Sequence, residues 1–316
     1  MKPVAIISIL LIVLILAGCS SIPTMNKEKP TIYAFINPTD TEYWQQVAWG
    51  LEGSASAGNV EMNINGINII DDYENSMDLI KKSIRKSTDA IIIRPFESEE
   101  LHKLLKKAEK KGIPILYIDE PVNYDVPGTY IYSDNEKASI RAGDALANLL
   151  DGDGKVVMLN IASENPKSIE REKGFKKAIL EFPGMKLVNA FDCNSSRDIT
   201  KKTMADILAA HPDIRGIFVA CPETAAGAVS ALTALNKIND IKIVAFDHTS
   251  ETMDYINAGF ISAAVRQNPY QLGYTAVETA LQIIAGKTVP EQIDVGYDFA
   301  GQETIDNVEG ESTLQN

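Results

Sequence analysis

The sequence predicts an α/β fold made of two doubly wound parallel-sheet lobes. Short apolar runs alternate along the chain with helical patterns, which is typical of doubly wound sheets. Most of these runs are continuous, which indicates strands that are buried on both faces. A unit of strand, proline, helix, strand and aspartate occurs twice. About 285 of the 316 residues follow position 30, which suits two lobes of ordinary size.

Seven apolar runs predict the strands of these sheets. They cover residues 31–36, 90–93, 113–118, 155–160, 216–220, 241–246 and 261–265.

Apolar residues at helical spacing predict helices around residues 44–51, 101–108 and 272–284. Thr39 with Glu42, and Ser133 with Glu136, have the spacing of a capping box, so we expect helices to begin at these two threonine and serine positions.

The amino-terminal residues 1–18 predict a targeting segment. Lys2 supplies a positive charge, and the apolar run over 4–17 is shorter than the roughly 20 residues of a membrane-spanning helix. The quartet from Leu16 to Cys19 resembles a bacterial lipobox, in which the cysteine is lipidated. We therefore expect a lipid anchor on Cys19. The alternative is an ordinary cleaved signal followed by a chance cysteine.

Residues 19–30 read as a lipidated tether, because this segment is polar and lacks apolar periodicity. Eleven flexible residues reach roughly 18 Å, enough to lift a folded domain off a membrane. We expect an extracytoplasmic protein that partners the cell membrane through its anchor and is a monomer.

Charge and cysteine content exclude several classes of protein. The formal net charge of −13 repels phosphate backbones, so we expect no nucleic-acid partner. Beyond Cys19, the remaining Cys193 and Cys221 have no CxxC spacing, so no metal site is expected, and a disulfide between them stays open. The sequence has no P-loop, GxGxxG, HExxH or GxSxG motif, and we expect neither a cofactor nor an enzyme.

The repeated unit directs attention to two aspartates. The first copy runs over 90–119 and the second over 216–247, so Asp119 and Asp247 each end a buried strand. Ligands of open parallel sheets bind outside the carboxyl ends of the strands, and we expect both carboxylates in one crevice. Carboxylates accept strong hydrogen bonds from hydroxyl groups, which suits a polyhydroxylated ligand. The alternative is that each caps the following helix or loop.

Aromatic and cationic side chains could complete this crevice. Tyr43 and Trp44 follow the first strand, where an aromatic face can cover a sugar ring, although Trp44 also fits core packing. Arg94 ends another strand and Arg266 lies beside Gln267. Each arginine could enter the crevice or pair with a nearby acid.

Residues 31–295 resemble the type I periplasmic binding proteins, the group that includes the ribose-binding protein. The resemblance rests on ordered motifs. They are Glu42-Tyr43-Trp44-Gln45, Gly112 to Asp119, Ser133-Asp134-Asn135, Glu170 to Phe175, Ala245-Phe246-Asp247 and Ala264 to Pro269.

The resemblance implies a receptor that captures a sugar, polyol or nucleoside and passes it to an ABC permease. The alternatives are a signalling receptor for a membrane sensor, which uses the same site, and an enzyme that cuts glycosides with its carboxylate pair. It also implies three hinge crossings near residues 132–134, 266–268 and 291–295. The amino-terminal lobe would comprise 31–132 with 268–291, and the carboxy-terminal lobe 133–267 with 292–316.

The resemblance assigns ligand contacts residue by residue. It places them at Asn37, Tyr43, Trp44, Asp119, Asp247 and Gln267. Arg171 matches a structural arginine of the family.

The chain departs from the ribose-type pattern at four positions. Glu120 stands where the pattern has an arginine, Ile169 where it has a second arginine, Cys221 where it has an asparagine and Ser195 where it has an aromatic residue. Glu120 and Cys221 remain candidates for ligand contact. The four departures put ribose itself in doubt.

Overall fold

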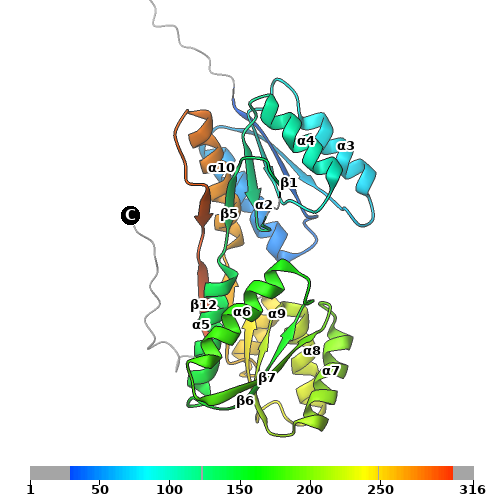
Figure 1. The fold of residues 1–316 in the computed structure, drawn as a ribbon, viewed down its shortest axis with the longest axis vertical. Helices are drawn as coiled ribbons and strands as arrows, with labels where there is room; N and C mark the ends of the chain where they lie inside the picture. Colours follow the sequence, from blue (N-terminus) through cyan, green and yellow to red (C-terminus); the bar gives the residue numbers. More distant parts are fainter. Residues whose placement is uncertain (1–28, 122–123, 248, 302–316) are drawn as a thin grey trace, which may run out of the picture.

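The computed structural model describes residues 29–121, 124–247 and 249–301, and it consists of two lobes that each enclose a six-stranded sheet (Figure 1). The predicted fold class is confirmed. The elements of the first lobe are β1 (Thr31–Ile36), α2 (Glu42–Ala57), β2 (Glu61–Gly66), α3 (Tyr73–Ser83), β3 (Ala90–Ile93), α4 (Glu99–Lys110), β4 (Ile115–Ile118), β5 (Thr129–Tyr132), α10 (Pro269–Ile284) and β11 (Gln292–Asp294).

The second lobe has the same layered construction. Its elements are α5 (Asn135–Leu149), β6 (Asp153–Asn160), α6 (Pro166–Leu180), β7 (Gly184–Asp192), α7 (Arg197–Ala210), β8 (Ile214–Val219), α8 (Pro222–Ala234), β9 (Lys242–Phe246), α9 (Ser250–Asn257), β10 (Ala263–Gln267) and β12 (Tyr297–Gly301).

Both sheets are wound in the same sense. Their strand orders are β11-β5-β4-β3-β1-β2 and β12-β10-β9-β8-β6-β7. Neighbouring strands are parallel except for β10 and β12, which pair antiparallel. In each lobe the carboxyl ends of the central strands point toward the other lobe, and this arrangement sets where a shared site can form (Figure 1).

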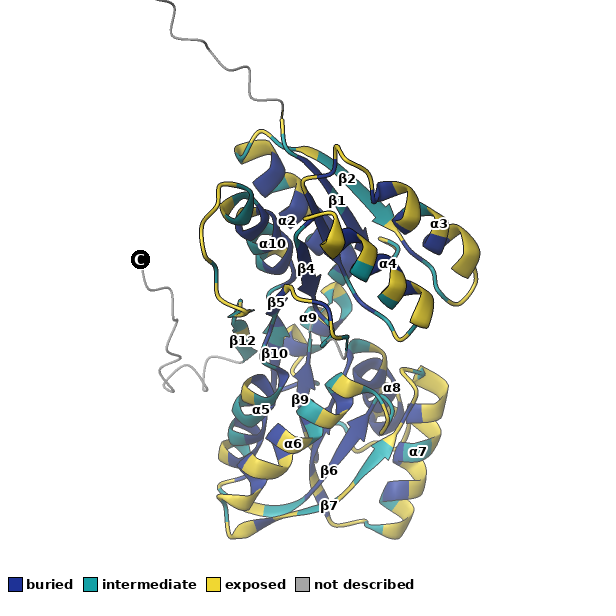
Figure 2. Cartoon of the chain, turned by 45° about the horizontal axis from the view of Figure 1, so that its top comes forward, coloured by how far each residue is buried: buried dark blue, intermediate teal, exposed yellow. Residues whose placement is uncertain are grey.

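Helices cover both faces of each sheet, because successive strand residues point to opposite faces. In β1, Ile32, Ala34 and Ile36 pack against α2 and α10, whereas Phe35 packs against α3 and α4. In the second lobe α5 and α6 cover one face, and α7, α8 and α9 cover the other. Figure 2 shows the resulting buried sheets between helices with exposed outer faces.

The seven predicted strands are all present, two with the expected bounds and five with ends shifted by one or two residues. The sequence did not predict β2, β5, β7, β11 or β12. Four of these lie at sheet edges, where one side of the strand is free and half-exposed residues replace a continuous apolar run. The remaining one, β5, alternates between buried and half-buried residues.

Both capping-box predictions are wrong. Helix α2 begins after Thr41, whose side chain accepts a hydrogen bond from Trp44 N. Helix α5 begins after Asp134, whose carboxylate accepts from Lys137 N at 2.9 Å. In both cases another residue with a short oxygen-bearing side chain lies one or two positions further along and caps instead.

The chain passes between the lobes three times, after β5, after β10 and after β11. The third crossing falls between residues 294 and 297, because β11 still pairs with β5 in the first sheet, beyond the lobe boundary expected at 291. Val295 N donates to Tyr132 O at 2.8 Å, and Asp134 N donates to Asp294 Oδ1 at 3.2 Å, so two of the crossings are bonded to each other.

The predictions for the amino-terminal segment concern residues that the structure mostly does not describe. The signal segment, Cys19 and most of the tether lie outside the described residues. Within the residues that are described, no helix has both the length and the apolar character needed to cross a bilayer.

Close packing of α2 against α10 positions the start of α2, which carries Tyr43. A Cβ atom on Gly273 would lie 2.1 Å from Val47 O, in the backbone of α2. We expect Gly273→Ala to lower the free energy of unfolding by about 1–3 kcal/mol, the usual cost of overpacking. Thermal and urea unfolding measure this loss.

Gly53→Ala is the matched control on the same helix pair. Its Cβ would lie 2.6 Å from the Tyr270 hydroxyl, the far end of a half-exposed side chain that can rotate. Equal stability of the Gly273→Ala variant and the wild type would contradict the packing argument.

Candidate functional site

Asp119 and Asp247 occupy equivalent positions in the two lobes. Each follows the carboxyl end of a central strand, β4 or β9, and each has a left-handed backbone, with φ of 72° and 62°. Aspartate tolerates this conformation better than most residues. Their amides donate to the neighbouring strand, Asp119 N to Ile131 O at 3.0 Å and Asp247 N to Val265 O at 2.7 Å. The repeated sequence unit therefore has the same backbone conformation at its final aspartate in both lobes.

Asp119 is buried and binds donors from both lobes. Its Oδ1 accepts from the Tyr43 hydroxyl at 2.5 Å, and its Oδ2 accepts from Lys167 Nζ at 2.6 Å. Burial acts to raise the pKa of Asp119, but the Lys167 charge and the two hydrogen bonds outweigh it and hold the pKa below its ordinary value. The carboxylate is therefore ionised at neutral pH.

Tyr43 connects the two aspartates electrostatically. Burial raises the pKa of its hydroxyl well above the ordinary value, the Asp119 carboxylate raises it further, and Asp247 from the other lobe adds to the increase. Arg171 of the second lobe acts in the opposite direction. The Tyr43 hydroxyl thus lies within electrostatic range of both carboxylates, which supports one shared crevice.

Asp247 is held by its own lobe. Its carboxylate accepts from Gln267 N at 3.1 Å and from Gln267 Nε2 at 2.9 Å. Arg171 Nη2 lies 3.7 Å from it, and the guanidinium stacks on the Phe246 ring. Arg171 also donates to Ala220 O at 2.5 Å, so it ties together the ends of β8 and β9 behind the aspartate.

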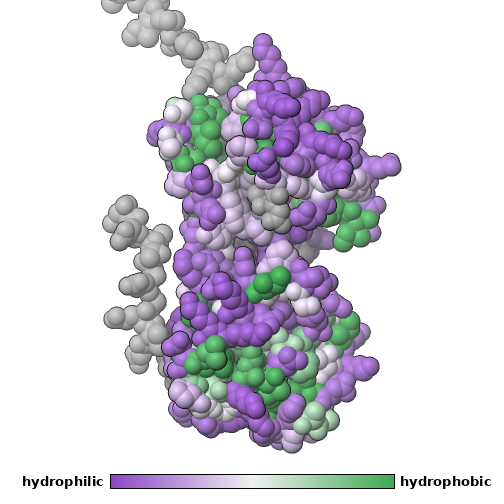
Figure 3. All heavy atoms as spheres, viewed as in Figure 1, coloured by the Kyte–Doolittle hydropathy of each residue, from purple (hydrophilic) through white to green (hydrophobic). Residues whose placement is uncertain are grey.

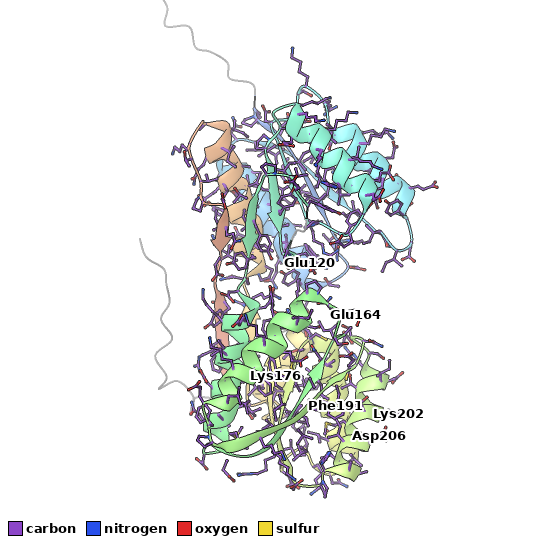
Figure 4. The ribbon with its side chains drawn as sticks, viewed as in Figure 1. Glu120, Glu164, Lys176, Phe191, Lys202 and Asp206 are labelled. Atoms are coloured by element: carbon purple, nitrogen blue, oxygen red, sulfur yellow. The ribbon has the colours of Figure 1, made fainter. Side chains whose placement is uncertain are left out.

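Two further contacts join the lobes around this centre. Glu42, the first residue of α2, accepts from Ser250 N at 3.1 Å at the start of α9. Glu120 lies 3.2 Å from Arg94 Nη2 and 3.6 Å from Lys167 Nζ. In Figure 4 Glu120 is seen at the end of the first lobe that faces the second.

A cavity of about 230 Å³ opens between the lobes beside these residues. The first lobe contributes Arg94 and Glu120 to its lining, and the second lobe contributes Asn165 and Pro166. On the face shown in Figure 3, mainly hydrophilic side chains surround the junction of the lobes, which suits a polar ligand.

The remaining predicted residues of the first lobe lie at the same edge with different surroundings. Asn37 follows β1 directly and is half-buried. Trp44 is 7% exposed within the apolar core of the first lobe, and its ring meets Tyr43 edge-on at a centroid distance of 5.2 Å. Trp44 therefore supports the position of Tyr43.

In the second lobe, Cys221 caps α8 and lies 3.6 Å from the Ser195 hydroxyl. Cys221 and Cys193 are both free, so the disulfide left open by the sequence is not formed. Arg266 pairs with Asp298 on the adjacent strand β12, which is the ion-pair alternative for this arginine.

The sequence analysis did not identify Lys167, although its 2.6 Å hydrogen bond to Asp119 joins the two lobes. A signal was present, because Lys167 is the second residue of a helix capped by Asn165, where a positive charge opposes the helix dipole. Nothing in the sequence shows that the opposing charge comes from a strand end 48 positions earlier. Among the described residues, no group of histidine, cysteine, aspartate and glutamate side chains could hold a metal ion.

Comparison with known protein families and sequences gives consistent matches. A model described as the periplasmic binding protein domain matches residues 32–288. The D-ribose/D-allose-binding protein of Pseudomonas aeruginosa is 25% identical over 299 residues, covering 90% of this chain and 93% of that protein. The ribose import binding protein RbsB of Bacillus subtilis is 25% identical over 301 residues, covering 93% and 97%.

Solved structures give the same result. An ABC transporter periplasmic solute-binding protein from Actinobacillus succinogenes, solved with bound D-allose, matches with a TM-score of 0.80 at 26% identity. The match covers 88% of this chain and 100% of that one.

The Tyr43 hydrogen bond contributes to the low pKa of Asp119, which can be tested directly. We expect Tyr43→Phe to raise the pKa of Asp119 toward its ordinary value, because one of the bonds to the ionised form is lost. Carboxyl carbon NMR over a pH titration measures the change. Tyr73→Phe removes an exposed hydroxyl bonded to Ser98 and serves as the control. An Asp119 pKa that is unchanged or lowered in Tyr43→Phe would contradict the assignment.

Proposed function

The chain belongs to the periplasmic binding protein family, and from this premise we propose that it captures a sugar or sugar-like molecule between its lobes for delivery to an ABC importer. The motif resemblance noted in the sequence is confirmed by the family match over residues 32–288. The observation that carries the proposal is the pair of equivalent strand-end carboxylates, Asp119 and Asp247, which both act on the Tyr43 hydroxyl between the lobes.

The arrangement supports binding by closure. Asp119 and Tyr43 come from the first lobe, while Asp247 and Gln267 come from the second. A ligand that bonds to both sets is enclosed when the lobes rotate about the three crossings. Ionised carboxylates form charge-assisted hydrogen bonds with hydroxyl groups, so a polyhydroxylated ligand suits these positions.

The geometry argues against glycoside cleavage. A general acid for that reaction needs a carboxyl group with a raised pKa. The pKa of Asp119 is instead lowered, and Asp247 is bonded to Gln267. Relatives whose names describe binding proteins support a function without chemistry.

The relatives suggest the class of ligand. One is named for D-ribose and D-allose, another for ribose import, and a matching structure holds D-allose. We propose a pentose, a hexose or a close derivative as the ligand. Glu120, Cys221, Arg94 and Arg266 remain candidate contacts, since each lies at or near the facing strand ends.

We also propose that the protein acts outside the cytoplasm and is anchored through lipid on Cys19. Family membership supports the compartment. The quartet ending at Cys19 and the polar tether after it support the anchor. Two acyl chains hold a protein on a membrane far more stably than one.

A thermal-shift panel of pentoses, hexoses, polyols, sugar acids and nucleosides tests the ligand proposal. A ligand at 100 times its Kd stabilises the native state by about 2.7 kcal/mol, which a melting curve detects. We expect Asp119→Asn and Asp247→Asn each to abolish the shift. Asparagine keeps the size of the side chain and tolerates the left-handed backbone.

Asp240→Asn is the control, since Asp240 pairs with Lys237 on the surface of the second lobe. A full ligand response in both strand-end variants would contradict the site. Absence of any shift with every compound in wild-type protein would contradict the proposed function.

The anchor proposal is tested by Cys19→Ala. We expect this variant to move from the membrane fraction to the soluble fraction of expressing cells, because the residue that would carry the acyl chains is gone. Cys193→Ala, which removes a buried cysteine of the second lobe, should stay in the membrane fraction. Membrane retention of Cys19→Ala would count against lipidation.

A further inference from the structure

Lys167 lies where its positive charge does not stabilise its own helix. It is the second residue of α6, where a cation opposes the positive end of the helix dipole. The negative charges that stabilise the Lys167 ammonium group come from the other lobe. They are Asp119 at 2.6 Å and Glu120 at 3.6 Å. Its side chain is only 14% exposed, and Nζ lies 5.7 Å from the centre of the Tyr43 ring.

The ammonium group keeps spare donors in this position. It has three N–H donors, of which one binds Asp119. Glu120 is an ion-pair partner at 3.6 Å, but this distance is too long for a hydrogen bond. Among the described residues, Lys167 therefore has one partner at hydrogen-bond distance.

Arg94 brings a second unsatisfied donor to the same place. Its Nη2 donates to Glu120, but its Nε is buried and has no hydrogen-bond partner among the described residues. The 230 Å³ cavity is lined by Arg94 and by Asn165 and Pro166, the two residues that precede Lys167. Arg94 and Glu120 of the first lobe thus line the cavity opposite the start of α6, which carries Lys167.

The buried acceptor at this end of the crevice, Asp119, already has protein partners. Both oxygens of Asp119 have a protein donor, Tyr43 on one and Lys167 on the other. A neutral sugar that offers hydroxyl donors finds fewer free acceptors here than at an unoccupied carboxylate. A carboxylate on the ligand would instead accept charge-assisted hydrogen bonds from the spare N–H donors of Lys167, whereas an ammonium group offers these donors no acceptor.

We propose that Lys167 is a specificity-determining residue that selects a sugar acid over the neutral or amino sugar of the same ring. The inference rests on the proposed function, since it concerns a ligand of the same crevice. Lys167 donates one hydrogen bond to Asp119 and uses its other N–H donors to bind the ligand carboxylate. Arg94 supports it from the first lobe.

Isothermal titration with matched ligand sets tests this selection. The probes are glucuronate, glucose and glucosamine, and the galactose counterparts galacturonate, galactose and galactosamine. In wild-type protein we expect at least one acid to bind more tightly than its neutral partner, with the amine weakest. We expect Lys167→Met to weaken binding of that acid by about tenfold or more, because a hydrogen bond between charged groups is lost, and to reduce the preference over the neutral sugar.

Lys173→Met is the matched control, since Lys173 lies on the same helix, is exposed and pairs with Glu136. It should leave all affinities unchanged. Tighter binding of a neutral sugar than of its acid would overturn the inference while leaving the proposed function in place. Tighter binding of neutral sugars by Lys167→Met would also overturn it, because Lys167 would then compete with the ligand for Asp119. If none of the six sugars binds but a pentose or a nucleoside raises the melting temperature in the thermal panel, the sugar-acid selection is overturned and the proposed function stands.

Discussion

The buried carboxylate of Asp119 is the constraint on which the crevice depends. It sits at the end of a central strand, with one oxygen bonded to Tyr43 of its own lobe and the other to Lys167 of the facing lobe. Removing one partner of a buried ion pair leaves an uncompensated charge, at a cost of about 3–5 kcal/mol. Separation of the lobes would break this pair, so the pair contributes to fixing how the two lobes lie relative to each other.

The direction of the Asp119 pKa shift determines the pH range over which this carboxylate stabilises the fold. Because the pKa is lowered in the folded protein, the ionised carboxylate contributes stability above its ordinary value of about 4. That contribution is lost only as the pH falls from there through the lowered folded value. At neutral pH the Asp119 carboxylate is therefore ionised.

Much of the architecture could be predicted from the sequence, because the central strands are continuous apolar runs buried on both faces. The repeated unit also indicated Asp119 and Asp247, which have the same left-handed backbone in the two lobes. Edge strands such as β2 and β7 escaped prediction because their half-exposed residues carry no clear period. Lys167 was not predicted as a site residue because its partner lies on the other lobe, and pairing across lobes depends on the tertiary structure. The Gln267 bond to Asp247 lies within the second lobe and was missed because it depends on the pairing of β10 with β9, although Gln267 itself was a candidate.

The central claim is that a single ligand is shared by the two strand-end carboxylates. A crystal structure of the protein with the sugar that gives the largest thermal shift tests it most directly. The account predicts one molecule between the lobes, within hydrogen-bond distance of both Asp119 and Asp247. A ligand bound to one lobe alone, or in a cavity that neither carboxylate reaches, would contradict it.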